Sequence, residues 1–571
     1  IAPLHTRADG PVTAVPSLRP RGPGWRICQI HAGPDPKTAN AAVADDVQNG
    51  VGGLVLHIEA PGRYGLPMRS TTLAEALDGV DPGRISVALM AGDNALDAAG
   101  VLTALWRARG TPADTCHGAF NFDPLGTLAR TGALTWPIER AVGLAATFAA
   151  DPQWAGLPVT ALLADGCPYH EAGGSDGQEL AAMLATLVAY LRACDGLGLA
   201  PPRALARIAV ALAADADLFS VVAKLRAARW LIRRVADACG AGVQAGDVPL
   251  TVVTSERMMA RHDPWTNILR TTVACAGAAF GGADAIAVRP FTHALGQPDA
   301  FARRVARNIQ IVLQDEAALG RVLDPAAGSW YVDRLTDALA HKAWTLFQDI
   351  EAGGGMAAAL KSGSVQDRIA AVAQERDRRI AAGKDPLTGV SAFPYLDDKG
   401  IATAPHPPVP PVADAARQIR ALTPRRLAEP FETLRDAAEA HRIRTGKRPS
   451  VFLASLGPLA DHGARSTWAQ NFFAAGGLEA PTSAGYETAA EAAAAFRTSQ
   501  TAAACICAAD TAAAALVEET VRALRAEGAK LLLLAGRPEN RGALAIDMFV
   551  FAGSDALAAL AAAHRLLGVR G

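Results

Sequence analysis

Short apolar runs alternate with longer segments of helical periodicity from the N-terminal part of the chain to about residue 345. The runs lie about thirty to fifty residues apart, which is the spacing of successive βα units. We expect strands at these runs, of which the last is the weakest: Val51–Ile58, Arg84–Met90, His117–Asp123, Pro158–Asp165, Arg207–Ala213, Pro249–Thr254, Asp284–Arg289 and Arg321–Leu323. Eight such units in series predict a closed (β/α)₈ TIM barrel.

One helical segment shows the period of an amphipathic helix. Its apolar stripe recurs at steps of four and three: Val221, Leu225, Ala228, Ile232 and Val235. Arg226, Arg229 and Arg233 share another face. We expect the charged ends of these arginines to reach water.

A second α/β pattern begins at about Pro449. Four apolar runs predict strands and a fifth is a weak candidate: Val451–Leu456, Ala502–Cys507, Lys530–Ala535, Met548–Ala552 and, weakest, Leu478–Thr482. The alanine-rich segments between them predict helices, because alanine has the highest helix propensity. Five parallel strands in about 120 residues are typical of a flavodoxin-like, doubly wound sheet.

These patterns place the chain in the α/β class and divide it into four parts. Residues 1–25 carry five prolines and predict an extended N-terminal arm. Residues 26–395 hold the barrel and a trailing helical segment from about Asp333 to Ala382. Residues 396–447 include the run APHPPVPP and predict a linker, while residues 448–571 form the second sheet domain.

Charge and composition exclude some classes of partner. The formal net charge is -1, and no basic cluster predicts binding to nucleic acid or to an anionic membrane. We find no apolar run long enough to span a membrane and no leader pattern, so we expect a cytoplasmic protein. The eight cysteines are scattered without a C-x-x-C pair, which indicates reduced thiols.

Polar residues follow the expected barrel strands at their carboxyl ends, where barrel enzymes hold their chemistry. They are His57, Glu59, Asp123, Asp165, His170 and Glu171. A metal-dependent hydrolase built on His57, Asp123 and His170 is one hypothesis. We favour the alternative, in which these residues cap helices and close the barrel mouth, because polar residues are common in such turns.

A loop is expected after the first strand of the second domain, at Leu456–Gly463. Its position faces the crevice in which open sheets bind ligands. His462 is therefore a candidate ligand, and a solvated loop histidine is the alternative.

Several segments resemble the methylmalonyl-CoA mutase family. They are FNFDPLGT at Phe120–Thr127, YHEAGG at Tyr169–Gly174, VAKLRAARW at Val222–Trp230, ARNIQIVLQDEA at Ala306–Ala317, RVLDPAAGSWYVDRLTDALAHKAW at Arg321–Trp344 and EAGGGM at Glu351–Met356. The order of barrel, linker and flavodoxin-like domain fits the family over nearly the whole chain. The resemblance implies a cobalamin-dependent conversion of methylmalonyl-CoA to succinyl-CoA.

The chain departs from the family at the positions that carry chemistry in active members. Where those resemble S-G-Y-H-x-Q-E-A-G, Cys167 and Pro168 replace the tyrosine and the histidine. The glutamine of the family's third strand corresponds to Asn121. The cobalt-ligand motif D-x-H-x-x-G of the second domain is absent, because Asp461 and His462 are adjacent.

The resemblance, taken with these departures, implies the small, non-catalytic (beta) subunit of a heterodimeric mutase. We expect no catalytic, cofactor-binding or metal-binding residue in this chain, and we interpret Asn121, Cys167, Pro168, Asp461 and His462 as vestigial. Adenosylcobalamin is expected on a catalytic large subunit, which this chain stabilises. Arg140 is a weaker candidate for the arginine that holds the substrate carboxylate in active members, with an exposed helix arginine as the alternative. A mutase for another acyl-CoA, as a subunit or alone, and the metal-dependent TIM-barrel hydrolase stay open.

Overall fold

The computed structural model describes residues 24–242, 248–413, 417–510, 514–538 and 544–569. The predicted arm, residues 1–25, lies almost entirely outside the described residues. The chain divides into two compact units. Unit 1 comprises Ile1–Met259, Asn267–Ala373 and Ala402–Arg426, and unit 2 comprises Ala260–Thr266, Gln374–Ile401 and Leu427–Gly571.

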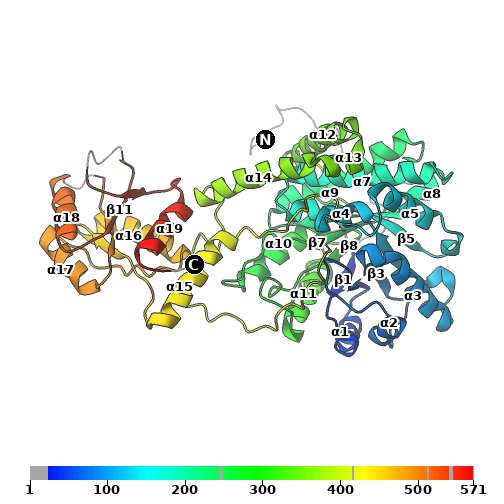
Figure 1. Ribbon diagram of the computed structural model, residues 1–571, viewed down its shortest axis with the longest axis horizontal. Coiled ribbons are helices and arrows are strands. Elements are labelled where there is room, and N and C mark those ends of the chain that lie inside the picture. The colour runs from blue at the N-terminus through cyan, green and yellow to red at the C-terminus, as the bar shows by residue number, and fades with distance from the viewer. Residues whose placement is uncertain (1–23, 243–247, 414–416, 511–513, 539–543, 570–571) are drawn as a thin grey trace. The chain divides into compact units, whose positions relative to one another are not determined.

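Unit 1 is built on a closed barrel of eight parallel strands, ordered β1 to β8 (Figure 1). The strands are β1 Arg26–His31, β2 Gly53–His57, β3 Ser86–Met90, β4 Gly118–Phe122, β5 Val159–Asp165, β6 Ile208–Ala214, β7 Leu250–Thr254 and β8 Ala285–Ala287. The barrel closes where β1 pairs with β8, with Arg26 opposite Ala285. The predicted TIM barrel is confirmed.

One predicted barrel strand is wrong, and the strand that closes the barrel was missed. Arg321–Leu323 forms bends, and Val322 is 58% exposed there. The strand that was missed is β1. Its side chains that face the surrounding helices include two buried polar ones, Gln29 and His31. Gln29 donates to the carbonyl oxygen of Arg303 at 3.0 Å. Polar residues satisfied in this way hide a strand from a search for apolar runs.

Helices cover the outside of the barrel (Figure 1). They are α1 Pro36–Gln48, α2 Ser70–Ala76, α3 Ala95–Ala108, α4 Pro124–Thr131, α5 Ile138–Ala150, α6 Cys167–Glu171, α7 Asp176–Asp195, α8 Pro201–Leu205, α9 Leu218–Ala238, α10 Thr266–Phe280 and α11 Ala300–Ile311. The helical segment expected after the barrel is present as α12 Trp330–Ala352, α13 Gly355–Ser362 and α14 Ser364–Ala381.

The helix α9 confirms the predicted apolar stripe but corrects the prediction for its arginines. Arg226 and Arg229 are buried and do not reach water. The guanidinium of Arg226 pairs with Asp333 at 2.7 Å, and that of Arg229 pairs with Asp284 at 2.7 Å. Both arginines therefore join neighbouring elements inside the unit. The spacing of the sequence gave no sign of these carboxylates, because they lie tens of residues away.

Unit 2 holds a parallel sheet of four strands in the order β12-β11-β10-β9. The strands are β9 Phe452–Ser455, β10 Ala503–Cys507, β11 Leu531–Ala535 and β12 Met548–Val550, and the helices are α15 Glu429–Thr445, α16 Leu459–Ala475, α17 Ala489–Ser499, α18 Ala514–Ala526 and α19 Ala556–Leu566. The weak candidate at Leu478–Thr482 is not a strand, although Glu479 forms an isolated parallel bridge with Ser450. The flavodoxin-like class of this sheet stays a prediction.

Two whole-chain expectations bear on the search for a site. Among the described helices, none is long and apolar enough to cross a membrane. The cysteines are free thiols, six of them buried, with Cys167 half-buried and Cys239 exposed.

Candidate functional site

The barrel of unit 1 is hollow. It contains a cavity of about 1240 Å³. The interior of such a barrel is usually filled by layers of branched side chains, but many of the residues that line this cavity are small: Cys28, Gly53, Ser86, Ala88, Ala119, Ala209, Ala211 and Ala285. Because lining residues come from both ends of the strands, the cavity follows the barrel axis and has room for a ligand.

The carboxyl end of this cavity is lined by charged side chains. Arg63, Arg130 and Arg289 all line it. Burial lowers the pKa of Arg63 to about 9, and the neighbouring charge of Arg130 adds to the shift. Burial, followed by the charge of Arg63, also holds the pKa of His57 well below its ordinary value, so His57 is neutral at pH 7. Arg130 is paired with Asp165 at 3.1 Å. Asp165, Glu171 and Glu256 line the same cavity, so its arginines are balanced by carboxylates.

Residues 402–413 and 417–426, parts of the predicted linker, contact the carboxyl end of the barrel, where His406, Val409 and Pro424 line the cavity. Nδ1 of His406 and the hydroxyl of Tyr64 are hydrogen-bonded at 3.0 Å. The amide of Gly62 donates to the carbonyl oxygen of Pro410 at 2.9 Å. The amide of Arg425 donates to a backbone carbonyl at the end of α6. These two segments therefore help to close the cavity.

The six polar residues expected at the strand ends do not form one site. His57, Asp165 and Glu171 line the cavity, whereas Asp123 and His170 are buried outside its lining and Glu59 is exposed. Arg63, Arg130 and Arg289 were missed, because each lies in a loop or helix whose sequence gives no motif.

Asp123 has the structural role that we favoured for it. Its carboxylate caps α4 by accepting from the amide of Gly126 at 2.9 Å. It also accepts a hydrogen bond from the hydroxyl of Tyr190 and one from the amide of Asp165 at 3.2 Å. Burial, followed by the charge of Asp165, raises the pKa of Asp123 to about 7.

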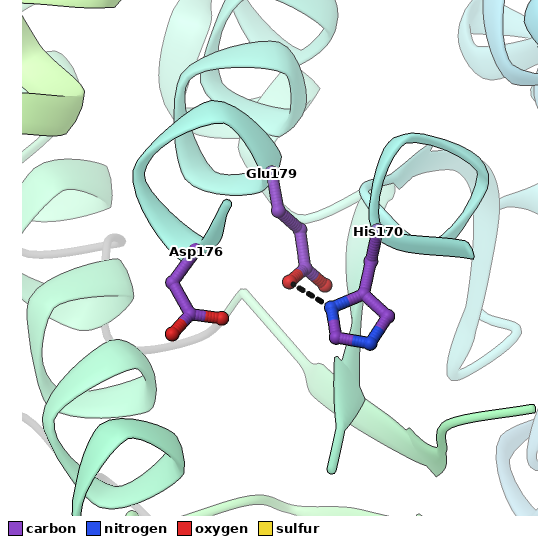
Figure 2. A group of neighbouring side chains, drawn as sticks. All are labelled: His170, Asp176 and Glu179. Atoms are coloured by element: carbon purple, nitrogen blue, oxygen red, sulfur yellow. Dashed lines mark ion pairs between the residues drawn. The ribbon is translucent and has the colours of Figure 1, made fainter. Parts of the chain in front are cut away.

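The side chains of His170, Asp176 and Glu179 lie close enough together to share a metal ion (Figure 2). Among the described residues, no other group of metal-binding side chains lies this close together. However, the ammonium group of Lys224 already lies among them. It is 2.9 Å from Asp176 and 2.7 Å from Glu179, and its side chain is fully buried. Nδ1 of His170 is 3.2 Å from Glu179. Lys224 supplies the positive charge that a metal would bring, so these residues do not fit a metal ion.

Cys167 and Pro168, which we expect at the places of the family's tyrosine and histidine, begin α6. Cys167 lines the cavity, and burial raises the pKa of its thiol well above the ordinary value. Pro168 is buried in the first turn of α6, where proline is tolerated because the turn needs no donor from its nitrogen. Neither side chain can donate a strong hydrogen bond to a ligand.

Asn121 and Arg140 complete the barrel residues singled out from the sequence. Asn121 lines the cavity with a φ of 52°, a left-handed conformation that asparagine tolerates better than most residues. Its side-chain amide donates to the sulfur of Met90 at 3.6 Å. Arg140 is exposed on α5 and lies outside the cavity lining, so the alternative of an exposed helix arginine holds.

In unit 2, His462 lies on a helix and is buried, which corrects the expectation of a solvated loop. It belongs to the first turns of α16. Its Nδ1 is hydrogen-bonded to the hydroxyl of Ser466 at 3.0 Å, and its Nε2 lies 3.3 Å from the carbonyl oxygen of Ala484. A β-carbon at Gly485 would lie only 2.8 Å from Nε2. The backbone at residues 484–485 thus covers the nitrogen that a cobalt ion would need, while Asp461 is exposed.

A second side chain fills the carboxyl edge of the same sheet. The guanidinium of Arg465 donates to the carbonyl oxygen of Ala508, after β10, and at 3.4 Å to that of Ala535, at the end of β11. It also pairs with Asp510 at 2.6 Å. This edge is where an open α/β sheet binds its ligands. The residues of unit 2 therefore do not fit a bound cobalamin at this edge.

Comparison with known proteins gives a family match over most of the chain. Residues 16–440 match the family described as methylmalonyl-CoA mutase. The chain is 46% identical to the methylmalonyl-CoA mutase small subunit of Streptomyces virginiae, over 99% of this chain and 90% of that protein. It is 34% identical to the protein of that name from Propionibacterium freudenreichii subsp. shermanii, over 95% of this chain and 83% of that protein.

Proteins named methylmalonyl-CoA mutase without the subunit qualifier are similar over a shorter stretch. The one from Escherichia coli is 35% identical over 39% of this chain and 32% of its own length. Among solved structures, a dihydropteroate synthase from Coxiella burnetii, in complex with pteroic acid, covers 52% of this chain at 11% identity. That alignment covers 94% of the synthase with a TM-score of 0.25, which is too low to support an argument.

Proposed function

Because the chain belongs to the methylmalonyl-CoA mutase family, we propose that it is the small, non-catalytic subunit of an adenosylcobalamin-dependent methylmalonyl-CoA mutase. The proposal rests mainly on how much of the chain is similar to each group of relatives. The match to proteins named small subunit runs over nearly the full length of the chain. The match to the mutase of Escherichia coli covers 39% of this chain.

The barrel supports a role without catalysis. In active members, as the resemblance implies, a tyrosine and a histidine act at the fourth strand on the cofactor and on the thioester. Cys167 and Pro168 at these places supply no hydroxyl and no imidazole. Electrostatic help to a developing charge needs a donor aimed at it, and neither residue offers one.

Unit 2 supports the same conclusion. His462 is fully buried and both of its ring nitrogens have partners. To reach cobalt, its Nε2 would have to displace the backbone at residues 484–485. We therefore propose that the adenosylcobalamin of the complex is bound by a catalytic large subunit and that this chain, in a cytoplasmic heterodimer, stabilises that partner.

The proposal also includes the class of the second domain and the bounds of the domains. A sheet order of β12-β11-β10-β9, with a parallel bridge beyond β9, supports a flavodoxin-like domain that has lost a regular strand at one edge. We propose an arm at residues 1–25, a barrel with its trailing helices at 26–395, a linker at 396–447 and the degenerate cobalamin-binding domain at 448–571.

The test is to purify this chain alone, its large partner alone and the pair, and to titrate each with adenosylcobalamin while recording the visible spectrum. We expect no spectral change with the lone chain, and one cobalamin bound per pair together with succinyl-CoA formation. Binding and turnover by the lone chain would overturn the proposal and favour a self-sufficient mutase. In that case His462→Ala decides whether His462 is the cobalt ligand, because the spectral change would then be lost.

A further inference from the structure

The outer side of α10 in unit 1 is apolar, whereas other outer helices of the unit carry charged residues on their outer sides. Within α10, the exposed residues are Leu269 and Val273, at 66% and 36%. The single charged residue of this helix is Arg270, which donates to the side chain of Asn267. By contrast, exposed positions on α1 and α3 include Lys37 and Arg107. A helix that faces only water is expected to carry charged residues on its outer side.

The apolar face extends from α10 to α9 and α11, which carry the exposed residues Phe219 and Phe301. On one side α10 packs against the first turn of α9, because a β-carbon at Gly277 would lie 3.1 Å from Val221. Phe219, in that turn of α9, is 52% exposed. On the other side, the side-chain amide of Asn267 donates to the carbonyl oxygen of Phe291.

Two more exposed aromatic residues mark the limits of this face. The ring of Phe291 packs edge-on against Phe301 of α11, which is 43% exposed. The ring of Tyr331 packs edge-on against Phe219, and the preceding residue, Trp330, is 42% exposed. We call this surface the α9–α11 face and define it by Phe219, Leu269, Val273, Phe301 and Trp330.

The exposed apolar area is of the size that a stable protein–protein contact needs. Large side chains bury roughly 150–250 Å² each, so five of them about half exposed offer on the order of 450 Å². A standard interface buries about 800 Å² on each partner, of which about 60% is apolar. The largest apolar patch on a typical monomeric protein is about 300–600 Å² and is often functional.

We propose that the α9–α11 face is the surface on which the catalytic large subunit docks. The inference rests on the proposed function, because that function requires a stable contact with a second chain. The size of the face matches what such a contact needs from one partner. Phe219, Phe301 and Trp330 are of the residue types that dominate the energy of interfaces, and Arg304 lies over the ring of Phe301 as part of the polar rim.

The test introduces a charge at the centre of the face and a matched charge elsewhere in unit 1. Leu269→Glu is the test variant. Leu197→Glu is the control, because Leu197 is 55% exposed in the turn after α7, away from α9–α11. Affinity for the purified large chain is measured by analytical ultracentrifugation, with cobalamin present. The thermal unfolding and the mass of each lone chain are recorded as well.

We expect Leu269→Glu to weaken the heterodimer at least thirtyfold and Leu197→Glu to change its affinity less than twofold. Equal affinities of the two variants would refute the docking surface while leaving the proposed function intact. A lone wild-type chain that dimerises, with the dimer lost in Leu269→Glu, would refute it in favour of a second copy of this chain. A lower unfolding temperature of the lone Leu269→Glu chain would refute it in favour of a segment of the chain itself. If the wild-type chain and the large chain do not associate at all, the proposed function fails.

Discussion

Replacing Lys224 by methionine tests whether the buried charges of unit 1 depend on one another. Methionine keeps most of the volume of the side chain and removes its charge. The ammonium group has two carboxylate partners, at 2.9 Å and 2.7 Å, and one of them, Glu179, is fully buried. Removing one member of a buried ion pair costs about 3–5 kcal/mol, because the remaining charge stays buried without a partner. We expect the lower half of this range, since Asp176 is 21% exposed and can be hydrated.

Urea unfolding followed by tryptophan fluorescence is the assay. Seven of the nine tryptophans lie in unit 1, so this signal follows the unit that holds Lys224. With a slope of about 3 kcal/mol per molar urea, a loss of about 3 kcal/mol lowers the midpoint by about 1 M. Lys361→Met is the control, because Lys361 forms an ion pair with Glu139 in which the two side chains are 47% and 71% exposed. An exposed pair contributes less than about 1 kcal/mol. Equal midpoints for the two variants would refute the reasoning.

The pH dependence of the same difference follows from the direction of the pKa shifts. Burial opposes the charge of Asp176, but the Lys224 ammonium outweighs it and lowers the pKa of Asp176 to about 2. An acid whose pKa is lowered by folding stabilises the fold above its unfolded pKa of about 3.9, and the effect is lost as the pH falls through the folded value. The pKa of Lys224 is raised by the two carboxylates against the effect of its burial, so its contribution is complete below about pH 10. Burial already raises the pKa of Glu179, and in Lys224→Met this carboxyl also loses the cation that lowers its pKa, so it binds a proton more readily. The difference between wild type and Lys224→Met should therefore grow as the pH rises from 5 to 9.

Three further substitutions test other buried contacts. Tyr190→Phe removes a hydrogen-bond donor to Asp123 and should lower the free energy of unfolding by about 1.5–3 kcal/mol. The loss should be larger at pH 8 than at pH 6, because the pKa of Asp123 is about 7 and the bond to the ionised carboxylate is the stronger one. A loss that is equal at both pH values in urea titrations would contradict this. Arg229→Lys keeps the charge but cannot reproduce the hydrogen bonds of the guanidinium to two carbonyl oxygens and a carboxylate. The free energy of unfolding, measured by urea titration, should therefore fall by about 2 kcal/mol. A fall of less than about 0.5 kcal/mol would argue against this role. Gly485→Ala adds a β-carbon only 2.8 Å from Nε2 of His462 at a φ of 113°, and it should lower the stability of unit 2 by about 2 kcal/mol, which calorimetry of the chain would detect as an earlier transition.

The barrel could be predicted from the sequence because several of its strands are buried on both faces. All seven residues of β5 and of β6 are buried, and such strands produce continuous apolar runs. The strand β1 lacks this signal, because Gln29 and His31 face the surrounding helices and lie beside polar groups that are distant in the sequence. His31, for example, lies 3.4 Å from Asp46 of α1. A pattern of hydrophobicity cannot reveal a polar residue whose partner is supplied by another element.

The candidate site was less predictable than the barrel, for a related reason. Position relative to a strand end identified His57 and Asp165, which line the cavity. It could not identify Arg63 or Arg289, which reach the same cavity from loops. It also could not show that Nε2 of His462 is covered, because the covering backbone lies more than twenty residues further along the chain. The sequence predicts that the D-x-H spacing is lost, because Asp461 and His462 are adjacent. In the structure, the backbone at residues 484–485 covers Nε2 of His462.

The way the barrel closes has a consequence for the synthesis of the protein. The strand β1 leaves the ribosome first, but its second partner, β8, begins only at Ala285, opposite Arg26. At about 5–20 residues per second, one edge of the nascent sheet waits on the order of 13–50 seconds for the strand that completes it. During this time an unpaired strand edge is open to association with other chains. Newly made copies of this chain are therefore expected to need protection by a chaperone during translation, even when the finished protein is stable.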